Sequence, residues 1–211
     1  MVYLCAAEAL EHNQLDRSRH VSGGIESWNW PTNSMMNVFC YANCPEVTLT
    51  LNVQVISTKH ASQAINGVLT WQIPYAPGVL RAVGRTNGQE VCAYVLRTAG
   101  APARLKLLPE TIQLHADGKD VCQIEFQIVD EQGVRVPEAT NEVSFTLTGP
   151  GRILGIGNGD LDNSESCQAL KHQAYQGRGL AILQAGNRAG GITFQAIAPG
   201  LEPAGVYVQS R

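Results

Sequence analysis

Charge is scarce in this sequence, and the few charges that it has show no basic excess. Only 16% of the 211 residues are charged, and 15 Lys and Arg stand against 18 Asp and Glu, which gives a formal net charge of −3. Nucleic acids and anionic membrane surfaces are bound mainly through clustered positive charge, so neither partner is expected. Disorder is not expected either, because 44% of the residues are apolar and disordered chains are poor in apolar residues.

Long apolar runs and helical periodicity are also missing. No stretch approaches the roughly 18 apolar residues of a membrane-spanning helix. The opening Met1–Leu10 lacks a positive region and is interrupted by Glu8, so we expect no secretory signal in this chain. No convincing helical pattern follows residue 16, and the chain is shorter than the roughly 250 residues of a (β/α)₈ barrel. That barrel is therefore excluded.

Cysteine and histidine form no recognisable site. The six cysteines include one close pair, Cys40 and Cys44, with no second pair and no histidines at the spacing of a zinc site. We interpret the cysteines as free thiols, expect no cofactor, and find that cysteine usage leaves the compartment open. The five histidines stand singly, and no Ser-His-Asp or Cys-His arrangement is readable. No catalytic residue is assigned.

Alternation of apolar and polar residues with a period of two begins after Trp28. It is clear at Val47–Leu51, Ile124–Ile128 and Val143–Leu147, and it indicates strands with one face in a core and the other in water. A fuller apolar run at Leu180–Leu183 is typical of a more central strand. Turn signals separate the strands at intervals of roughly eight to fifteen residues, the rhythm of antiparallel sandwiches. The sequence predicts an all-β chain.

A seam of small residues at Thr98–Ala103 divides the chain. We expect two tandem antiparallel β-sandwiches on either side of it, over residues 27–99 and 103–211. Residues 1–26 differ from the rest. Leu4–Leu15 predicts a short helix with a loosely apolar face, followed by a polar loop, and disorder is the alternative.

The three tryptophans are candidate carbohydrate-binding residues. Trp28 and Trp30 head the first unit and Trp71 lies on a predicted strand. Exposed tryptophan rings on a sandwich can stack on sugar rings. Packing in the core is the alternative that we favour, since residues at i and i+2 of a strand share one face.

A candidate metal site follows the glycine-rich Gly155–Gly159. Asp160, Asp162 and Glu165 place three carboxylates within six residues, and calcium prefers such oxygen-rich loops. The spacing does not match an EF-hand. A solvated loop with Asx turns is the alternative that we favour.

A series of short stretches, none of them diagnostic alone, follows the order of a known family. In the first half they are Trp28–Pro31, Val38–Val47, Trp71–Val83 and Arg97–Pro102; in the second half they are Ala116–Gly118, Val129-Asp130, Val136-Pro137, Gly149–Gly151, Asn158–Asp160, Glu165-Ser166, Gly177 and Ala198–Leu201. From Trp28 to its C-terminus the chain resembles the tail of large bacterial β-galactosidases of glycoside hydrolase family 2.

This resemblance implies a non-catalytic role. In that family the catalytic glutamates lie on a barrel that precedes the tail, and the tail consists of immunoglobulin-like domains. The resemblance thus implies two tandem immunoglobulin-like antiparallel β-sandwiches that serve as scaffold or interface. It implies the catalytic barrel of the parent enzyme or a sister subunit as partner, galactoside-containing glycans as weak ligands, and a bacterial parent in the periplasm or outside the cell.

Two alternatives stand beside the accessory role. One is a stand-alone carbohydrate-binding or adhesin-like module. The other is that the chain itself hydrolyses glycosides, which we disfavour because Glu142, in an Asn-Glu dipeptide, has no second carboxylate placed by any pattern. Asn52-Val53 also departs from the Asn-Gly turn of the family. Because valine disfavours positive φ, we expect that hairpin to turn differently.

Overall fold

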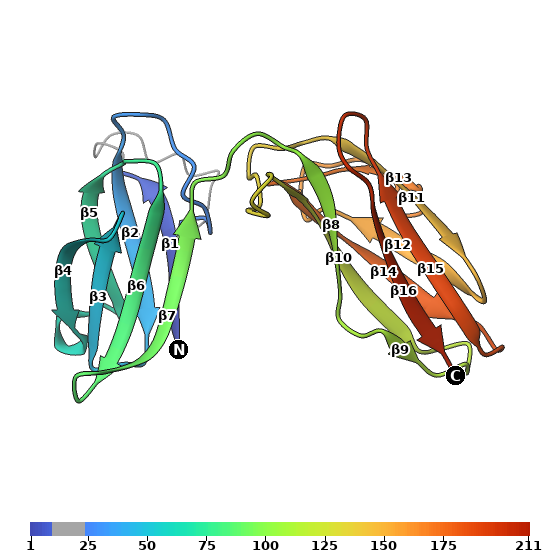
Figure 1. Ribbon diagram of the computed structural model, residues 1–211, viewed down its shortest axis with the longest axis horizontal. Helices are drawn as coiled ribbons and strands as arrows, with labels where there is room; N and C mark the ends of the chain where they lie inside the picture. The colour runs from blue at the N-terminus through green and yellow to red at the C-terminus, as the bar shows by residue number, and fades with distance from the viewer. Residues whose placement is uncertain (10–23) are drawn as a thin grey trace. The chain divides into compact units, whose positions relative to one another are not determined.

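The computed structural model describes residues 1–9 and 24–211, and it is all-β, as predicted (Figure 1). The chain divides into two compact units, Met1–Thr98 (unit 1) and Ala99–Arg211 (unit 2), and each contains two sheets. The helical content of the described residues is a single 3₁₀ turn, η1 (Ala61–Gln63). Accordingly, nothing helical in those residues is long and apolar enough to span a membrane.

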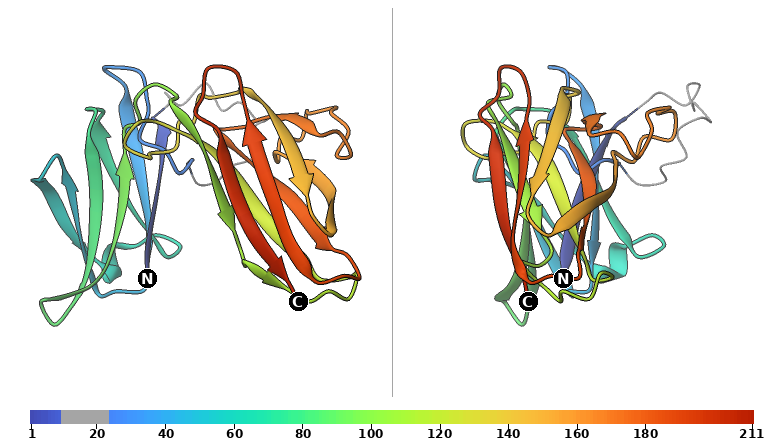
Figure 2. Two further views of the ribbon diagram at one scale, coloured as in Figure 1. Left: turned by 45° about the vertical axis from the view of Figure 1, so that its right-hand side comes forward. Right: turned by 90° about the vertical axis from the view of Figure 1, so that its right-hand side faces the viewer.

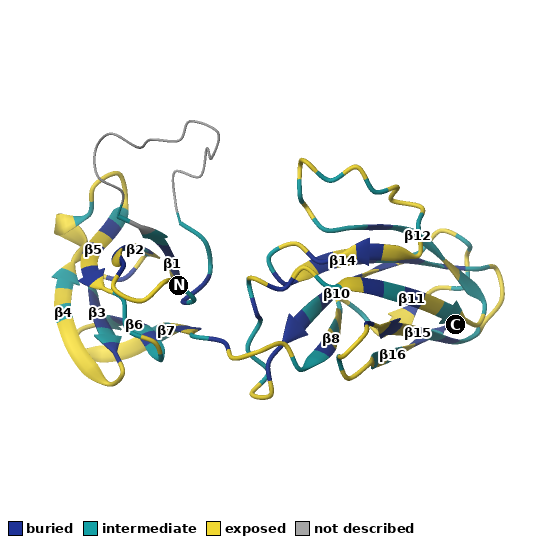
Figure 3. Ribbon diagram, turned by 90° about the horizontal axis from the view of Figure 1, so that it is seen from above, coloured by how far each residue is buried: buried dark blue, intermediate teal, exposed yellow. Residues whose placement is uncertain are grey.

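Unit 1 is a sandwich of a three-stranded and a four-stranded antiparallel sheet. The first sheet contains, in spatial order, β1 (Val2–Glu8), β2 (Met35–Ala42) and β5 (Val68–Pro74). The second contains, in spatial order, β4 (Gln54–His60), β3 (Glu46–Leu51), β6 (Val79–Thr86) and β7 (Gln89–Arg97). Strand β4 lies at the edge of the second sheet and is largely exposed (Figure 3).

The N-terminal residues join unit 1 as a strand, so the predicted helix over Leu4–Leu15 is wrong for Leu4–Glu8. Strand β1 pairs with β2 along its whole length. Val2, Leu4 and Ala6 are buried in the core of unit 1, which is the period-two spacing of a strand. Pairing with β2 also satisfies the backbone donors and acceptors of β1. The rest of the predicted helix lies outside the described residues.

The hairpin between β3 and β4 keeps the turn that valine was expected to prevent. Leu51 pairs with Gln54, so Asn52 and Val53 alone form the loop, with φ of 49° and 64°. The Asn52 side chain holds this conformation, because its amide donates to the carbonyl of Pro77 at 2.9 Å and its Oδ1 accepts the N–H of Val79 at 2.8 Å. The expectation of a different turn is therefore wrong.

Val53→Gly should stabilise unit 1. Val53 is 96% exposed and makes no buried contact that the substitution would remove. A β-branched residue in the left-handed region costs roughly 1–2 kcal/mol, and glycine does not bear this cost. The greater entropy of glycine in the unfolded chain offsets part of this gain. The free energy of unfolding of unit 1 should therefore rise by about 1 kcal/mol. Denaturation followed by tryptophan fluorescence measures it, since all three tryptophans belong to unit 1.

Val55→Gly is the matched control. Val55 is another exposed valine, but it lies in strand β4, where glycine lowers stability. The two variants should therefore shift the free energy of unfolding in opposite directions. A loss of stability in Val53→Gly equal to that in Val55→Gly would contradict the strained turn.

Unit 2 is a sandwich of a four-stranded and a five-stranded sheet. The four-stranded sheet contains, in spatial order, β12 (Gly151–Gly157), β14 (Arg178–Ala185), β10 (Val121–Val129) and β8 (Arg104–Pro109). The five-stranded sheet contains, in spatial order, β13 (Lys171–Gln173), β11 (Glu142–Thr148), β15 (Gly190–Ile197), β16 (Ala204–Ser210) and β9 (Gln113–Leu114). The pair β9–β16 is parallel and the other strand pairs are antiparallel. Figure 2 shows β15 and β16 side by side.

Three phenylalanines form the centre of the core of unit 2. Phe126 comes from the four-stranded sheet, and Phe145 and Phe194 come from the five-stranded sheet. The rings of Phe126 and Phe145 lie 4.9 Å apart between centroids, and those of Phe145 and Phe194 lie 5.6 Å apart and stacked. The contact between Phe126 and Phe145 joins the two inner faces of the sandwich, and Phe194 extends the cluster along the five-stranded sheet.

Candidate binding groove

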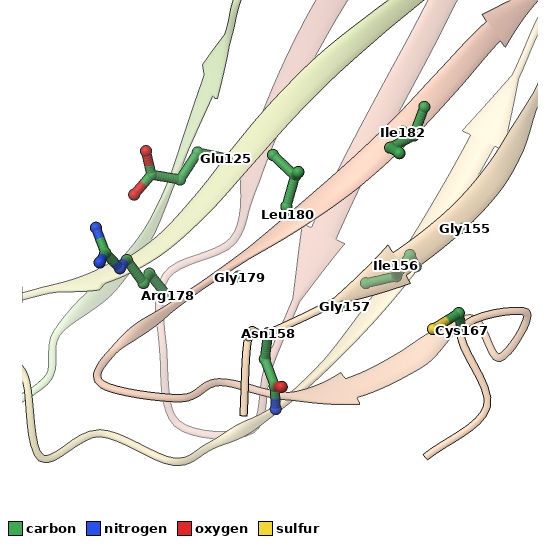
Figure 4. A pocket seen from close by; sticks show the side chains of 11 residues that line it. Glu125, Gly155, Ile156, Gly157, Asn158, Cys167, Arg178, Gly179, Leu180 and Ile182 are labelled. Atoms are coloured by element: carbon green, nitrogen blue, oxygen red, sulfur yellow. The ribbon is translucent and has the colours of Figure 1, made fainter. Parts of the chain in front are cut away.

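An open groove of about 580 Å³ lies on the outer face of the four-stranded sheet of unit 2 (Figure 4). Strands β10, β12 and β14 and the segment after β12 supply its lining. The side chains that shape it are those of Glu125, Asn158, Cys167, Arg178, Leu180 and Ile182.

Alternation along β14 explains why this outer face is apolar. Ala181 and Leu183 point into the core and are fully buried, whereas Leu180 and Ile182 face outward into the groove. On the neighbouring strand β12, Gly155 and Gly157 pair with Ile182 and Leu180. Because these glycines have no side chain, the space above them stays open.

Sequence reasoning missed this groove. The apolar run Leu180–Leu183 predicts a more central strand, and β14 does lie inside the sheet between β12 and β10, but the run does not show that two of its side chains face outward. The usable signal was the glycine pair at Gly155 and Gly157, because small residues on a neighbouring strand leave two outward apolar side chains uncovered.

The chemistry of the groove suits packing better than catalysis or sugar stacking. Glu125 is the single carboxylate among the lining residues, and Gln127 Nε2 donates to it at 2.9 Å. Hydrolysis of a glycoside needs two carboxylates that flank the bond. No lining residue is aromatic, so the groove offers no ring face to a sugar. Its apolar floor is formed by the outward side chains of Leu180 and Ile182.

The three carboxylates of the candidate metal site do not come together as a ligand set. Asp160 Oδ1 accepts the N–H of Asp162 at 3.1 Å, and Asp160 N–H itself donates to Asn158 Oδ1 at 3.0 Å. These are the Asx turns of the alternative interpretation. Within residues 1–9 and 24–211, no group of three or more His, Cys, Asp or Glu side chains is placed to hold a metal ion.

Glu165 instead connects its loop to strand β13 through hydrogen bonds. Its carboxylate accepts the N–H of Gln173 at 3.1 Å and the Asn163 amide at 2.8 Å. The ring Nδ1 of the buried His172 lies 3.2 Å from Glu165, within ion-pair distance but without hydrogen-bond alignment. The Asn163 amide lowers the pKa of Glu165, and the Gln173 N–H and His172 act in the same direction.

The tryptophans lie mainly in the core of unit 1. Trp28 is 0% exposed and its Nε1 donates to the carbonyl of Ala76 at 3.0 Å; Trp71 is 4% exposed and its Nε1 donates to Ser57 Oγ at 2.8 Å. Neither ring presents a face to a sugar, so these two cannot form a platform. Trp30 is half-buried at the edge of the core, and the stacking hypothesis rests on it alone.

Two family models match most of the chain. The model described as glycoside hydrolase family 2 C-terminal domain 5 matches residues 105–207, in unit 2. The model described as a domain of unknown function, DUF4982, matches residues 33–92, in unit 1.

Curated relatives match over most of this chain but only over a small part of themselves. The β-galactosidase BoGH2A of Bacteroides ovatus is 33% identical over 185 residues, which are 87% of this chain and 22% of the relative. A β-glucuronidase of Formosa agariphila is 29% identical over 190 residues, which are 88% of this chain and 19% of the relative. The chain thus spans about a fifth of the length of these relatives.

Solved structures also match most of this chain over a small part of their own length. A glycosyl hydrolase family 2 member from Bacteroides cellulosilyticus superposes with a TM-score of 0.84 at 27% identity, over 98% of this chain and 28% of its own. A β-glycosidase from Bacteroides vulgatus gives a TM-score of 0.83 at 26% identity, over 99% of this chain and 24% of its own. The chain belongs to glycoside hydrolase family 2 and corresponds to the C-terminal domains of its members.

Proposed function

We propose that this chain is the non-catalytic C-terminal part of a family 2 glycosidase that acts on β-galactosides or β-glucuronides, and that it packs against the catalytic part as a scaffold. The observation that carries the proposal is the coverage of the structural match. Nearly the whole chain aligns with a family 2 member while accounting for 28% of that member. The remaining part of such a protein is where the chemistry would lie.

The groove supports a packing role. It combines an apolar floor with one carboxylate and no aromatic ring, which favours a protein surface over a sugar as its occupant. Leu180 is 37% exposed on this face, and covering it and Ile182 with another part of the enzyme would remove apolar area from water. We also infer that the two units are separate domains, with their boundary in Thr98–Ala103.

A chimera tests the proposal. The matching C-terminal part of the Bacteroides ovatus β-galactosidase is replaced by this chain, and hydrolysis of p-nitrophenyl β-galactoside is compared with that of the enzyme truncated at the same point. We expect the chimera to recover activity that the truncated enzyme lacks, and this chain alone to show none. Activity of the chimera no higher than that of the truncated enzyme would overturn the packing role.

The chimera also tests the groove. Leu180→Glu places a charge on its floor and should reduce the recovered activity or the melting temperature of the chimera. Leu161→Glu is the matched control, because Leu161 is fully exposed and lies outside the groove lining. Equal effects of the two substitutions would argue against the groove as a contact surface.

The half-buried Trp30 keeps a second candidate function open, that of a carbohydrate-binding module working alone. Calorimetric titration of the chain with galactose-containing oligosaccharides separates the two functions. Saturable binding that disappears in Trp30→Ala would favour the module. We expect no saturable binding, because one partly covered ring offers little stacking area.

A further inference from the structure

Two cysteines far apart in the sequence meet in unit 1. Cys44 lies in the connection between β2 and β3, where the chain passes from one sheet to the other, and Cys92 lies on β7. Their Sγ atoms are 3.2 Å apart and in hydrogen-bond contact, although 48 positions separate them in the chain. Both cysteines are free thiols in this structure.

A glycine makes room for the two sulfur atoms. Gly84 on β6 pairs directly with Cys92. A Cβ at this position would lie 2.5 Å from Cys44 Sγ and 2.8 Å from Cys92 Sγ, closer than real Cβ contacts come. Gly84 does not have a positive φ, so its backbone conformation does not require glycine. The space above it is what the sulfur pair occupies.

The two thiols differ in access. Cys44 is buried, and burial raises the pKa of its thiol. Cys92 is half-buried and is thus the one that a reagent in solution reaches first. A third thiol, Cys40, is fully buried nearby, and burial together with Cys44 and Cys92 raises its pKa to about 12. Cys40 therefore stays protonated and is a poor nucleophile.

We propose that Cys44 and Cys92 are a disulfide-forming pair, oxidised by exchange with a low-molecular-weight disulfide such as oxidised glutathione. The Cys92 thiolate attacks one sulfur of the reagent, forms a mixed disulfide and releases the first reduced thiol. The Cys44 thiolate then attacks Cys92 Sγ and releases the second. The two cysteines lose two protons and two electrons, and the reagent gains them as two thiols.

The bridge would restrain unit 1 at the crossing between its sheets. It would tie the β2–β3 connection to β7, the edge strand of the second sheet. Closing a loop of this length restricts the unfolded chain. The melting temperature of unit 1 should then rise on the order of 10 °C on oxidation and return on reduction.

Peptide mapping tests the pair directly. The full chain carries Cys167→Ser, which removes the exposed thiol of unit 2 and its intermolecular disulfides. The protein is equilibrated with oxidised glutathione, quenched in acid, alkylated, digested and analysed by mass spectrometry. We expect a Cys44–Cys92 crosslinked peptide, alkylated Cys5, Cys40 and Cys122, and the rise in melting temperature.

Two variants keep the proposal falsifiable. Cys44→Ala lacks the resolving thiol, so glutathione should accumulate as a mixed disulfide on Cys92. Cys92→Ala should leave Cys44 alkylated and the melting temperature unchanged by oxidation. Alkylation of both Cys44 and Cys92 after oxidation of the native protein, a bridge to Cys40 instead, or a bridge that forms only in denaturant would each overturn the pair.

Discussion

Trp28→Ala should lower the free energy of unfolding of unit 1 by about 3–5 kcal/mol, the cost typical of removing a large aromatic side chain from a core. Trp28 is fully buried, and its ring lies 5.3 Å from that of Tyr75 between centroids. The substitution leaves a cavity and removes the donor to the carbonyl of Ala76. Domains of this size are stable by roughly 5–15 kcal/mol, so unit 1 would be left marginal.

The position of Trp28 amplifies this cost. Its own carbonyl accepts the Thr98 hydroxyl at 2.8 Å and the Tyr75 hydroxyl at 3.3 Å. The segment before β2 is thus fastened to the end of β7 by the backbone of the same residue whose ring fills the core. Collapse around an alanine would disturb these hydrogen bonds, because packed interiors relax only partially.

Fluorescence of the remaining tryptophans measures the loss. Trp30 and Trp71 stay in the variant as reporters of unit 1, and unit 2 contains no tryptophan. Trp30→Ala is the matched control, and its cost should be clearly smaller because Trp30 is half-buried. Equal losses in the free energy of unfolding would contradict the prediction that the burial of the Trp28 ring makes it the more important of the two.

The sequence was sufficient for the fold class because the period-two pattern is a direct consequence of one buried face per strand. It was insufficient at residues 2–8, where Val2, Leu4 and Ala6 have the spacing of a strand but Leu4, Ala7 and Leu10 also fit a loose helical face. The β2 partner that decides between them lies about thirty-five residues away in the sequence. A single sequence does not reveal such a pairing.

The candidate sites were harder to predict from the sequence, because they too depend on residues that are distant along the chain. Whether Trp28 faces a core or a ligand depends on the second sheet, and whether Asp160 binds an ion depends on which backbone N–H groups its loop brings near. The turn at Val53 was mispredicted because the local preference of valine was weighed without the two hydrogen bonds that Asn52 makes across the loop. Hydrogen bonds to fixed partners thus determine the backbone conformation here against the local preference of the residue.

Asp130→Ala should be as costly in unit 2 as Trp28→Ala is in unit 1. Asp130 follows β10 and is buried, and its carboxylate accepts three backbone N–H groups: Gly100 at 2.8 Å, Gln132 at 2.9 Å and Val134 at 2.8 Å. Alanine leaves these donors without an acceptor, at roughly 1–3 kcal/mol for each one that stays buried. We expect a loss of about 3–5 kcal/mol in total.

The loss of free energy caused by Asp130→Ala should also depend on pH, because the carboxylate stabilises unit 2 only while it is ionised. Burial alone would raise the pKa of Asp130, but hydrogen bonds from Gly100, Val134 and Gln132 outweigh it and lower that pKa. A lowered pKa means that the stabilisation is fully present above the unfolded value of about 3.9 and is lost as the pH falls through the folded value.

Hydrogen exchange of the β10 amides, followed by mass spectrometry from neutral pH down to about pH 2, measures this for unit 2. The gap in free energy between native protein and Asp130→Ala should be constant near neutral pH and should narrow below about pH 4. Other carboxyl groups of unit 2 with lowered pKa, such as Asp120 and Glu165, are present in both proteins and cancel in the difference. A gap that stays constant down to the lowest pH would mean that Asp130 acts through packing and not through its charge.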